Sequence, residues 1–556
     1  MSVNKGFFRN TAIMFIAMFI VKFLGAVFKI PLGNILGGEG MGYFTTAFSI
    51  FTPVLAFTCS GIPAIITQVT AQKLSKGEFA DIIHLRRSAL FLGAVGGIIG
   101  TAVIYIAAVP FTCYIANSPE SLLSVMIIAP SVFFCSVTAV YRGYFEGLSD
   151  MLPTAVSQII EAVVKAAVGI GLSYYVYGLC VHRFGSEEQA LPYAAAAAIF
   201  GVTASELSGM LYIFLRSRRD DIGYKGCCKK GFRDIRDTSA EILKQSLPVA
   251  VGAVVSNLMS FTDLLTISNC INLSYHFFPD QLAGGVVPMS MLDEGGDPGN
   301  FLYGSYSGMV ISVYMLTATL PMLIARCSLQ RLVCTIELNR NDNIFAIVKD
   351  INIMLKGTLL IAAPISLFMA VFSEPVLNIL YPVRELEAAL GIVPLRILSI
   401  GGFFAAFEGA LLSVFQAYGD FKTPVSATLF GGFFKFLFNV VFLLITGVNI
   451  IGAAAATTVS NALASVYVVK KLKKKYSLDI KAYRTAYPSL ISASVSSLCG
   501  FFMYNAFITR FVPLLSLIFA VGEGGIMYFL ILFIVDSREL AEIFAVLRNK
   551  KCSKVL

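Results

Sequence analysis

The sequence predicts an all-α protein that crosses a membrane fourteen times and contains two similar halves. Three observations support this prediction: a high apolar content, apolar runs of about twenty residues, and a stretch that recurs half a chain later. Of the 556 residues, 57% are hydrophobic and 13% are charged, and the mean hydropathy is +0.79. A soluble chain would carry about 25% charged residues, so we expect a polytopic membrane protein.

The apolar runs have the length of membrane helices. A helix needs about 20 residues to cross the hydrocarbon core, whereas a barrel strand needs about 10 with alternating polarity. The first run continues without a small-residue cleavage site, so we expect a retained helix and not a removed signal peptide. The predicted spans are roughly 11–33, 42–70, 88–109, 121–141, 153–177, 192–215, 246–271, 301–325, 354–377, 392–418, 423–447, 450–469, 488–508 and 513–535.

The repeated stretch runs from Tyr141 to Lys165 and again from Phe415 to Lys435. At an offset of 270 residues, Phe145 falls on Phe415, Asp150 on Asp420 and Lys165 on Lys435. A repeat of this length in a membrane chain predicts two similar halves with a central site between them.

Basic residues are concentrated in alternate loops, which predicts the orientation. With the amino terminus inside, the cytoplasmic segments hold 33 Lys and Arg, whereas the outer segments hold only Arg183, Arg384 and Arg510. Cytoplasmic loops carry this excess, so both termini are predicted to be cytoplasmic. Because the net charge of +9 is spread over short loops, it does not indicate nucleic-acid binding. The basic runs at 216–244 and 470–475 are expected to contact anionic membrane lipids.

A charge inside a span needs a partner or a water-filled cavity. Lys165 and Lys435 each lie about 18 Å from the cytoplasmic start of their span, near the middle of the membrane. Lys22 and Lys29 are seven residues apart, about two helical turns, so they share nearly the same face. We hypothesise that Lys22, Lys29 and Lys435 line a central cavity and attract phosphate groups. Pairing with buried acids on other helices is the alternative.

Acidic residues also fall inside the predicted spans. Glu161 precedes Lys165 by four residues, the favourable order for an ion pair within a helix. Asp263 could titrate in ion coupling with H⁺ or Na⁺, or could pair with Lys22. The residues predicted to form ion pairs or to couple ions are Glu161, Lys165, Asp263 and Glu408, and two further buried acids are Glu206 and Glu523.

The turn inside the first copy of the repeat carries three charges. Arg142, Glu146 and Asp150 are spaced at i, i+4 and i+8, so they could form a local ion network near the inner surface. Pro153 follows at a position where a helix can begin, because its missing N–H costs nothing there. The turn is predicted to be either a capped structural turn or an inner gate.

The sequence contains no motif for an enzyme, a metal or a nucleotide. P-loop, GxSxG and HExxH patterns are absent, the eleven cysteines include no CxxC pair, and the three histidines are scattered. We therefore expect no enzymatic activity and no cofactor. Without an ATP site, transport would have to be driven by gradients or by consumption of the cargo.

Three motifs resemble a known family. The stretches KFLGAVFKIPLGNILGGEGMGYF from Lys22, SGIPAIITQVTAQ from Ser60 and YRGYFEGLSDMLPTAVSQIIE from Tyr141 are similar to motifs of stage V sporulation protein B and related polysaccharide biosynthesis proteins. The resemblance covers nearly the whole chain. It implies membership of the multidrug/oligosaccharidyl-lipid/polysaccharide exporter superfamily, which includes the lipid II flippase.

The resemblance implies two six-helix lobes around a cavity that alternates between inward and outward states, followed by two further helices that shape a groove for a lipid tail. It also implies that essential basic residues of the first helix map onto Lys22 and Lys29. The expected domains are 1–215 for the first lobe, 216–245 for a basic cytoplasmic linker, 246–469 for the second lobe, and 470–556 for the last two spans and a cytoplasmic tail.

The expected function is a monomeric flippase that moves a polyprenyl-pyrophosphate-linked saccharide to the outer leaflet of the cell membrane. One alternative is a cation-coupled multidrug exporter of the same fold, which would need a net acidic cavity. A second alternative is a membrane assembly protein of envelope or spore cortex synthesis that transports nothing.

Overall fold

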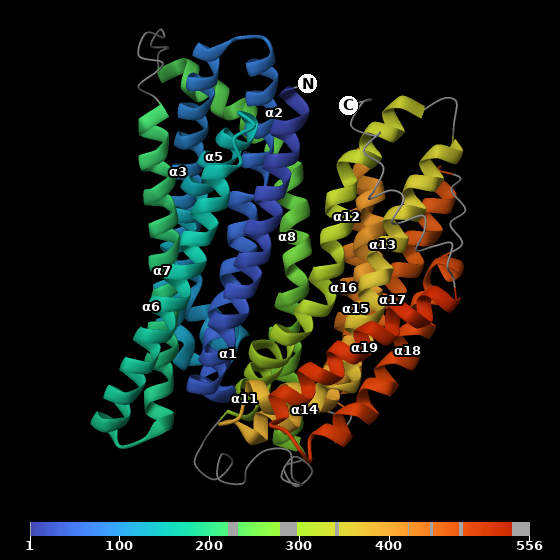
Figure 1. The fold of residues 1–556 in the computed structure, drawn as a ribbon. Coiled ribbons are helices and arrows are strands. Elements are labelled where there is room, and N and C mark those ends of the chain that lie inside the picture. The colour runs from blue at the N-terminus through green and yellow to red at the C-terminus, as the bar shows by residue number, and fades with distance from the viewer. Residues whose placement is uncertain are drawn as a thin grey trace. The chain divides into compact units, whose positions relative to one another are not determined.

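The computed structural model describes residues 2–220, 232–277, 297–339, 344–420, 422–444, 449–476 and 482–535. Every regular element in these ranges is helical (Figure 1). The helices before residue 221 are α1 (Ser2–Cys59), α2 (Gly61–Ser75), α3 (Phe79–Pro110), α4 (Leu122–Ile128), α5 (Ser131–Gly147), α6 (Leu152–Phe184) and α7 (Glu187–Asp220).

The remaining helices are α8 (Phe232–Phe277), α11 (Pro298–Tyr303), α12 (Ile311–Asn339), α13 (Ile344–Val371), α14 (Ser373–Leu380), α15 (Glu385–Ala417), α16 (Lys422–Leu444), α17 (Asn449–Tyr476), α18 (Ala482–Phe507) and α19 (Pro513–Val535). Short π-helical turns at Phe111–Ile115 and Gly304–Val310 and a 3-10 turn at Pro119–Ser121 join some of them.

The all-α, polytopic membrane fold predicted from the sequence is confirmed. Twelve helical stretches in the described ranges are long and apolar enough to cross a membrane. The first of them, Ile16–Leu74, has 59 residues and is long enough for two crossings, whereas α8 is not among the twelve. The count of fourteen spans therefore stays a prediction.

A backbone bend divides α1 into the two segments that the sequence separates. Gly37 has φ 61° and ψ −168° inside α1, a conformation that only glycine adopts readily. Glycines on both sides allow α1 to pack closely against α11 and the residue after it. A Cβ on Gly42 would clash with the Asn300 side chain, and a Cβ on Gly304 would clash with the Gly38 carbonyl oxygen. The glycine-rich motif at the start of the chain is therefore a packing motif.

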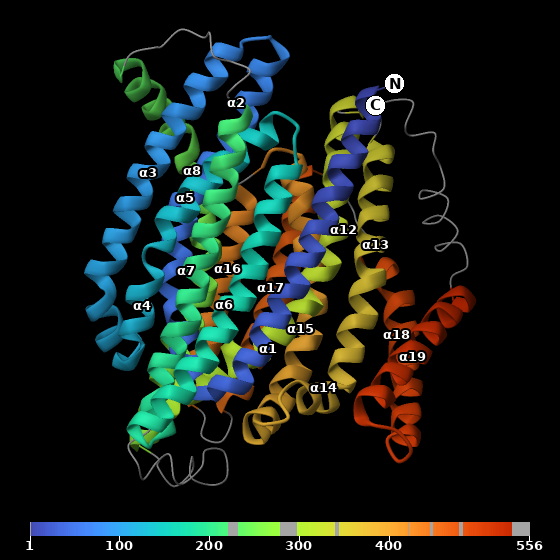
Figure 2. The same cartoon turned by 60° about the vertical axis from the view of Figure 1, so that its left-hand side comes forward.

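Helix ends follow from local sequence. α6 begins with a proline in its first turn and ends at Gly185, whose left-handed backbone (φ 71°) stops the helix. α6 and α7 run side by side as a long hairpin (Figures 1 and 2). At the start of α11, the Asp297 side chain accepts a hydrogen bond from the Asn300 N–H, as an N-cap residue does.

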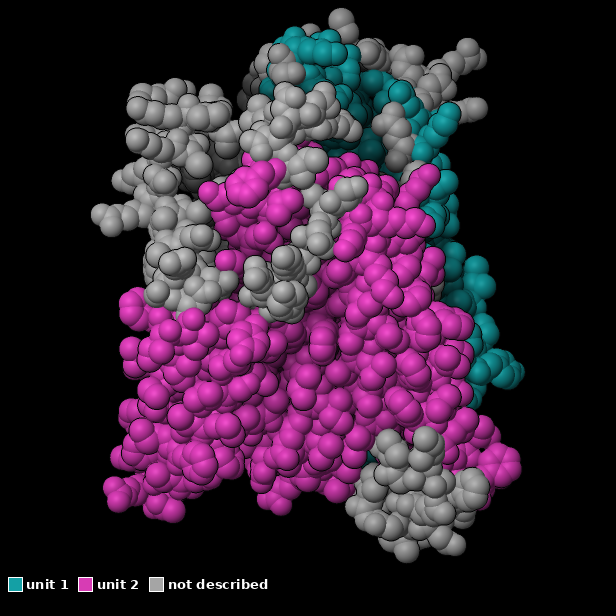
Figure 3. All heavy atoms as spheres, turned by 90° about the vertical axis from the view of Figure 1, so that its right-hand side faces the viewer, with its two compact units in different colours: residues 1–269, 295–304 teal, residues 270–294, 305–556 magenta. Residues whose placement is uncertain are grey.

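The chain folds into two compact units (Figure 3). Unit 1 comprises residues 1–269 and 295–304, and unit 2 comprises residues 270–294 and 305–556. Most of α8 lies in unit 1, whereas the predicted second lobe would begin at residue 246. The predicted lobe boundaries stay a prediction.

Candidate functional site

Three lysines approach one another in unit 1. Lys22 and Lys29 lie on α1, the first exposed and the second half-buried, and Lys165 is half-buried on α6. The charge of Lys29 interacts with those of both Lys165 and Lys22. The Lys165 ammonium also lies 5.7 Å from the centre of the Phe28 ring, close enough for a cation–π interaction. Packing of α1 on α6 therefore gathers three positive charges, which we call the lysine cluster.

Glu161 pairs with an arginine on the neighbouring helix. Arg142 Nη2 lies 2.7 Å from Glu161 Oε1, and both Arg142 Nε and Nη2 donate to Ser157 Oγ, at 3.1 and 3.0 Å. Both charged side chains are largely buried, with 20% and 13% of their surface exposed. The predicted Glu161–Lys165 ion pair is replaced by this contact, because the α5–α6 turn brings the guanidinium onto the carboxylate.

A second carboxylate faces the same group from α7. The charge of Glu206 interacts with those of Glu161 and Arg142. One turn further along α7, a Cβ on Gly209 would lie 2.0 Å from Glu161 Oε1, so this glycine lets α7 approach the Glu161 carboxylate. Sequence reasoning identified Glu206 as a buried acid but gave no reason to place it beside Glu161.

The two copies of the repeated turn have the same backbone hydrogen bonds. In the first, the N–H groups of Ser149 and Asp150 donate to the carbonyls of Glu146 and Phe145, at 2.9 and 3.0 Å. In the second, those of Gly419 and Asp420 donate to the carbonyls of Gln416 and Phe415, at 3.0 and 2.9 Å. The repeat read from the sequence is therefore a structural repeat of a helix-terminating turn.

The predicted ion network of Arg142, Glu146 and Asp150 is not the arrangement found. The Arg142 guanidinium turns to Glu161, Glu146 is half-buried in the last turn of α5, and Asp150 Oδ1 accepts a hydrogen bond from the Leu152 N–H at 3.3 Å. Asp150 thus caps the start of α6. Whether the turn acts as a gate stays a prediction.

The corresponding turn of unit 2 carries an additional ion pair. Asp420 Oδ2 lies 2.6 Å from Lys475 Nζ and accepts a hydrogen bond from Thr423 Oγ1 at 2.5 Å. Burial raises the pKa of the Asp420 carboxyl, but the hydrogen bonds from Lys475 and Thr423 outweigh this effect, so the pKa lies below its usual value. The basic end of α17 is thereby fixed to the α15–α16 turn.

The other predicted residues lie on helices α8, α15 and α16. Lys435 on α16 is 5% exposed and Glu408 on α15 is half-buried, both in unit 2. Asp263 on α8 is 7% exposed and belongs to unit 1. Within the described ranges, no three His, Cys, Asp or Glu side chains converge as a metal site.

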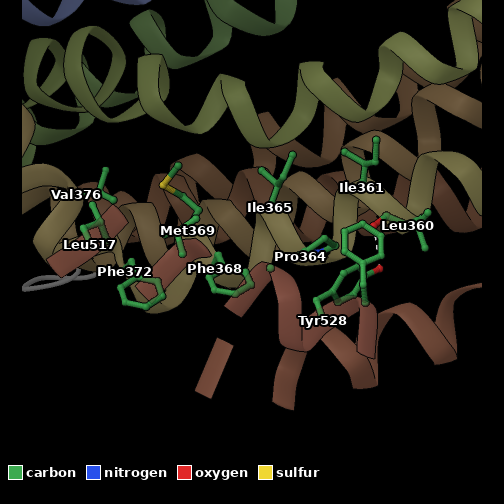
Figure 4. Close-up of a pocket in the computed structure, with 13 residues that line it drawn as sticks. Leu360, Ile361, Pro364, Ile365, Phe368, Met369, Phe372, Val376, Leu517 and Tyr528 are labelled. Carbon is green, nitrogen blue, oxygen red and sulfur yellow. Dashed lines mark hydrogen bonds between the residues drawn. The ribbon is translucent and has the colours of Figure 1, made fainter. Parts of the chain in front are cut away.

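Unit 2 contains an apolar pocket of about 390 Å³ (Figure 4). It lies between α13, α14 and α19, and only hydrophobic residues, one tyrosine and one glycine line it. Phe368 and Phe372 stack at 5.9 Å, and the Tyr528 hydroxyl donates to the Leu360 carbonyl at 2.8 Å. With the tyrosine hydroxyl bonded, the pocket offers a ligand almost no polar group.

Comparison with known proteins identifies the family. A sequence profile described as polysaccharide biosynthesis protein matches residues 7–325, more than half of the chain. The chain belongs to the polysaccharide biosynthesis protein family. A second profile, described as lipid II flippase MurJ, matches residues 301–522.

Individual relatives support this assignment. The chain is 22% identical over 502 residues to stage V sporulation protein B of Bacillus subtilis, covering 90% of this chain and 89% of that one. It is 23% identical over 222 residues to lipid II flippase MurJ of the same organism, covering 38% of this chain and 40% of that one.

Solved structures share the fold. A lipid II flippase MurJ structure in an inward closed conformation has a TM-score of 0.66 at 16% identity, covering 94% of this chain and 98% of that one. A multidrug resistance MATE transporter of the MOP superfamily has a TM-score of 0.63 at 15% identity, covering 82% and 94%. The chain therefore shares the fold of these solved transporters, and its twelve candidate spans make it a multi-pass membrane protein.

Proposed function

We propose that this protein moves a saccharide, linked through pyrophosphate to a polyprenyl carrier, from the inner to the outer leaflet of the cytoplasmic membrane by alternating access. The family supports the general assignment, a transporter of lipid-linked saccharides. The lysine cluster of unit 1 is the observation that supports a cargo linked through pyrophosphate.

The lysine cluster matches the charge of the proposed cargo. A pyrophosphate diester is a dianion at neutral pH, and the Lys29 ammonium lies within electrostatic range of those of both Lys22 and Lys165. An anion bound beside them would lower the cost of placing like charges together inside a membrane segment. A bound pyrophosphate would supply that compensation, and lysine would contact it as a compact point charge.

The apolar pocket of unit 2 matches the other end of the cargo. A polyprenyl tail is a branched hydrocarbon, and the pocket between α13, α14 and α19 presents aliphatic and aromatic surface to it. Phe368 and Phe372 supply broad apolar faces to this pocket, and their rings stack on each other (Figure 4). A tail isoprenoid unit held there would gain the usual free energy of burying apolar surface.

Reconstitution into vesicles with a fluorescent polyprenyl-pyrophosphate saccharide tests the proposal. Replacing Lys22 by Ala should slow flipping by about ten- to one-hundredfold. This factor corresponds to the free energy of one hydrogen bond to a charged group. Lys76→Ala, which removes an exposed lysine after α2, should flip at the normal rate. Normal flipping by Lys22→Ala would refute the assignment of the lysine cluster.

The buried acids of unit 1 favour one other candidate, a cation-coupled multidrug exporter. Such a protein would bind cationic cargo near Glu161 and Glu206 and would not need Lys22. Drug export that survives Lys22→Ala, in a protein that flips no lipid-linked saccharide, would support this candidate instead.

A further inference from the structure

A half-exposed ion pair lies at the start of α14, beside the apolar pocket of unit 2. Arg396 Nη2 on α15 lies 3.5 Å from Glu374 Oε2, and Arg396 Nε donates a hydrogen bond to Ser373 Oγ at 3.0 Å. The side chains of Arg396 and Glu374 are 47% and 58% exposed. Both charged groups are therefore accessible to a ligand.

The ion pair leaves hydrogen-bonding capacity for a ligand. Its contact of 3.5 Å is long, because a charge-assisted hydrogen bond between nitrogen and oxygen usually spans about 2.7–2.9 Å. Within the described ranges, the guanidinium directs one N–H to Ser373 and one Nη to Glu374, whereas a guanidinium has five donors. An exposed pair of this kind adds little to stability, so a better-matched ligand can separate the two charges at small cost.

Arg396 is expected at the level where lipid headgroups meet hydrocarbon. The span predicted at 392–418 begins four residues earlier, about 6 Å along the helix. Val393 and Ile400 lie on the same face of α15 as Arg396 and are 42% and 48% exposed. An arginine near the end of a span, flanked by exposed apolar side chains, extends its charge to the headgroups while its methylenes stay in the apolar region. We therefore expect the ion pair to lie among lipid headgroups.

The apolar pocket begins at the same helix. Phe372 and Val376 line it, and in Figure 4 they lie with Leu517 at one end of the pocket. Glu374 stands between Phe372 and Val376 in the sequence and points to the opposite face of α14. About one helix diameter, roughly 10 Å, therefore separates the carboxylate from the pocket. A molecule with a polar headgroup and a hydrocarbon chain can reach both.

We propose that the ion pair and the apolar pocket together bind a zwitterionic phospholipid that carries a primary ammonium group. Its phosphate contacts the Arg396 guanidinium, its ammonium contacts the Glu374 carboxylate, and its acyl chain enters the pocket. The two opposite charges of the protein thus match the two opposite charges of one headgroup. Arginine binds phosphate oxygens through a planar pair of donors, and an ammonium group offers three donors to a carboxylate.

The same two charges disfavour other lipids. A headgroup with a net negative charge and no ammonium brings its phosphate near Glu374 without compensating the carboxylate. A quaternary ammonium has no N–H to donate, so it compensates the carboxylate less well. The carrier pyrophosphate is a dianion, which Glu374 repels more strongly still. The ion pair therefore selects a membrane phospholipid over the head of the proposed cargo.

The phospholipid and the cargo use the pocket in turn. Resting on the proposed function, the polyprenyl tail displaces the acyl chain when cargo binds, and the phospholipid returns when the cargo leaves. Both are hydrocarbon chains, and the pocket of about 390 Å³ offers aliphatic and aromatic surface to either. The pocket is then filled in both states, which avoids the loss of dispersion contacts in an empty cavity.

Native mass spectrometry of the full chain tests the site without any transport assay. Phosphatidylethanolamine, phosphatidylcholine and phosphatidylglycerol with identical acyl chains are added to the protein in detergent. The parent protein should retain phosphatidylethanolamine about tenfold better than either other lipid, the factor expected for one charge-assisted hydrogen bond. Arg396→Gln should weaken the retention of phosphatidylethanolamine by about tenfold. Glu374→Gln should remove the preference over phosphatidylglycerol, because it removes the repulsion of that lipid.

Lys73→Gln is the matched control, because it breaks an ion pair with Asp81 in unit 1. It should retain all three lipids as the parent protein does. Equal retention of the three lipids by the parent protein would overturn the proposal, and so would stronger retention of phosphatidylglycerol or an unchanged preference in Arg396→Gln. Normal flipping by a protein without the lipid preference would refute only the phospholipid site, whereas the preference in a protein that flips nothing would refute only the proposed function.

Discussion

Ser149 and Gly419 occupy the same position in the two repeated turns, and both have a left-handed backbone, with φ of 60° and 73°. Glycine adopts this conformation without strain, whereas other L-residues pay about 1–2 kcal/mol for it. The two turns have the same hydrogen bonds. The turn of unit 1 therefore stores strain that the turn of unit 2 avoids.

Replacing Ser149 by Gly should stabilise the protein by about 0.5–1 kcal/mol, because it relieves this strain at a small cost in unfolded-state entropy. Gly419→Ala should destabilise it by about 1 kcal/mol. No atom lies within 4 Å of a Cβ at Gly419, so the loss would be conformational rather than steric. Thermal unfolding in detergent measures the stability of both variants. Equal melting temperatures for Ser149→Gly, Gly419→Ala and the parent protein would contradict the strain assigned to the turn of unit 1.

Asp420 should make the stability of unit 2 depend on pH in the acid range. The pKa of the Asp420 carboxyl is about 3.9 in the unfolded chain and lower in the folded protein. Its contribution to the free energy of unfolding is therefore fully present above the unfolded pKa and is lost as the pH falls through the folded pKa. Asp420→Asn should lower the melting temperature at neutral pH, and the difference from the parent protein should shrink as the pH falls below about 4.

The equivalent change in the first copy of the turn provides the control. Asp150 accepts a hydrogen bond of 3.3 Å from the Leu152 N–H, longer than the 2.6 Å contact between Asp420 and Lys475, so Asp150→Asn should show a smaller loss of melting temperature at neutral pH. A larger loss for Asp150→Asn than for Asp420→Asn would contradict the role given to the Lys475 ion pair.

Gly209 should be essential for the position of Glu161. A methyl group there would lie 2.0 Å from Glu161 Oε1, so Gly209→Ala must displace the carboxylate or separate α6 from α7, at a cost of about 1–3 kcal/mol. Gly178→Ala on α6, where no atom lies within 4 Å, should be neutral or stabilising because alanine favours helices. Melting temperatures of the two variants distinguish packing from helix propensity.

The sequence was sufficient for the fold class and for the repeated turn, because both depend on local information. Apolar runs set the helices, and the offset of 270 residues located two turns with the same hydrogen bonds. The bend at Gly37 shows the limit. Several glycines lie in this motif, and the sequence does not distinguish Gly37, which has the positive φ, from Gly42, which packs closely against Asn300.

The candidate site was harder to predict because its partners come from different helices. The spacing of Glu161 and Lys165 favoured an ion pair within α6, but an arginine on α5 reaches the carboxylate at 2.7 Å. Likewise, the basic run at 470–475 gave no reason to expect that Lys475, rather than a neighbouring lysine, pairs with Asp420. The repeat did indicate that Asp420 matters to its turn, since it is the counterpart of Asp150.

Two glycines on α19 provide a matched test of the apolar pocket. Gly525 lines the pocket and Gly522 does not, and a Cβ on either would meet no atom within 4 Å. Gly525→Phe should therefore place an aromatic ring in the space that a lipid tail would occupy, and its Cβ clashes with nothing. The prediction is a rise of about tenfold or more in KM for a saccharide carried on a long polyprenyl chain, since a few lost methylene contacts are worth about 0.8 kcal/mol each.

Gly522→Phe adds the same side chain to the same helix and should leave KM unchanged. A short-chain carrier, which reaches less of the pocket, should be flipped equally well by both variants. If Gly525→Phe impairs the flipping of long- and short-chain substrates alike, the substitution hinders a conformational change of the protein rather than binding of the tail. If it impairs neither, the tail is held elsewhere, and the lysine cluster alone would have to account for recognition of the carrier.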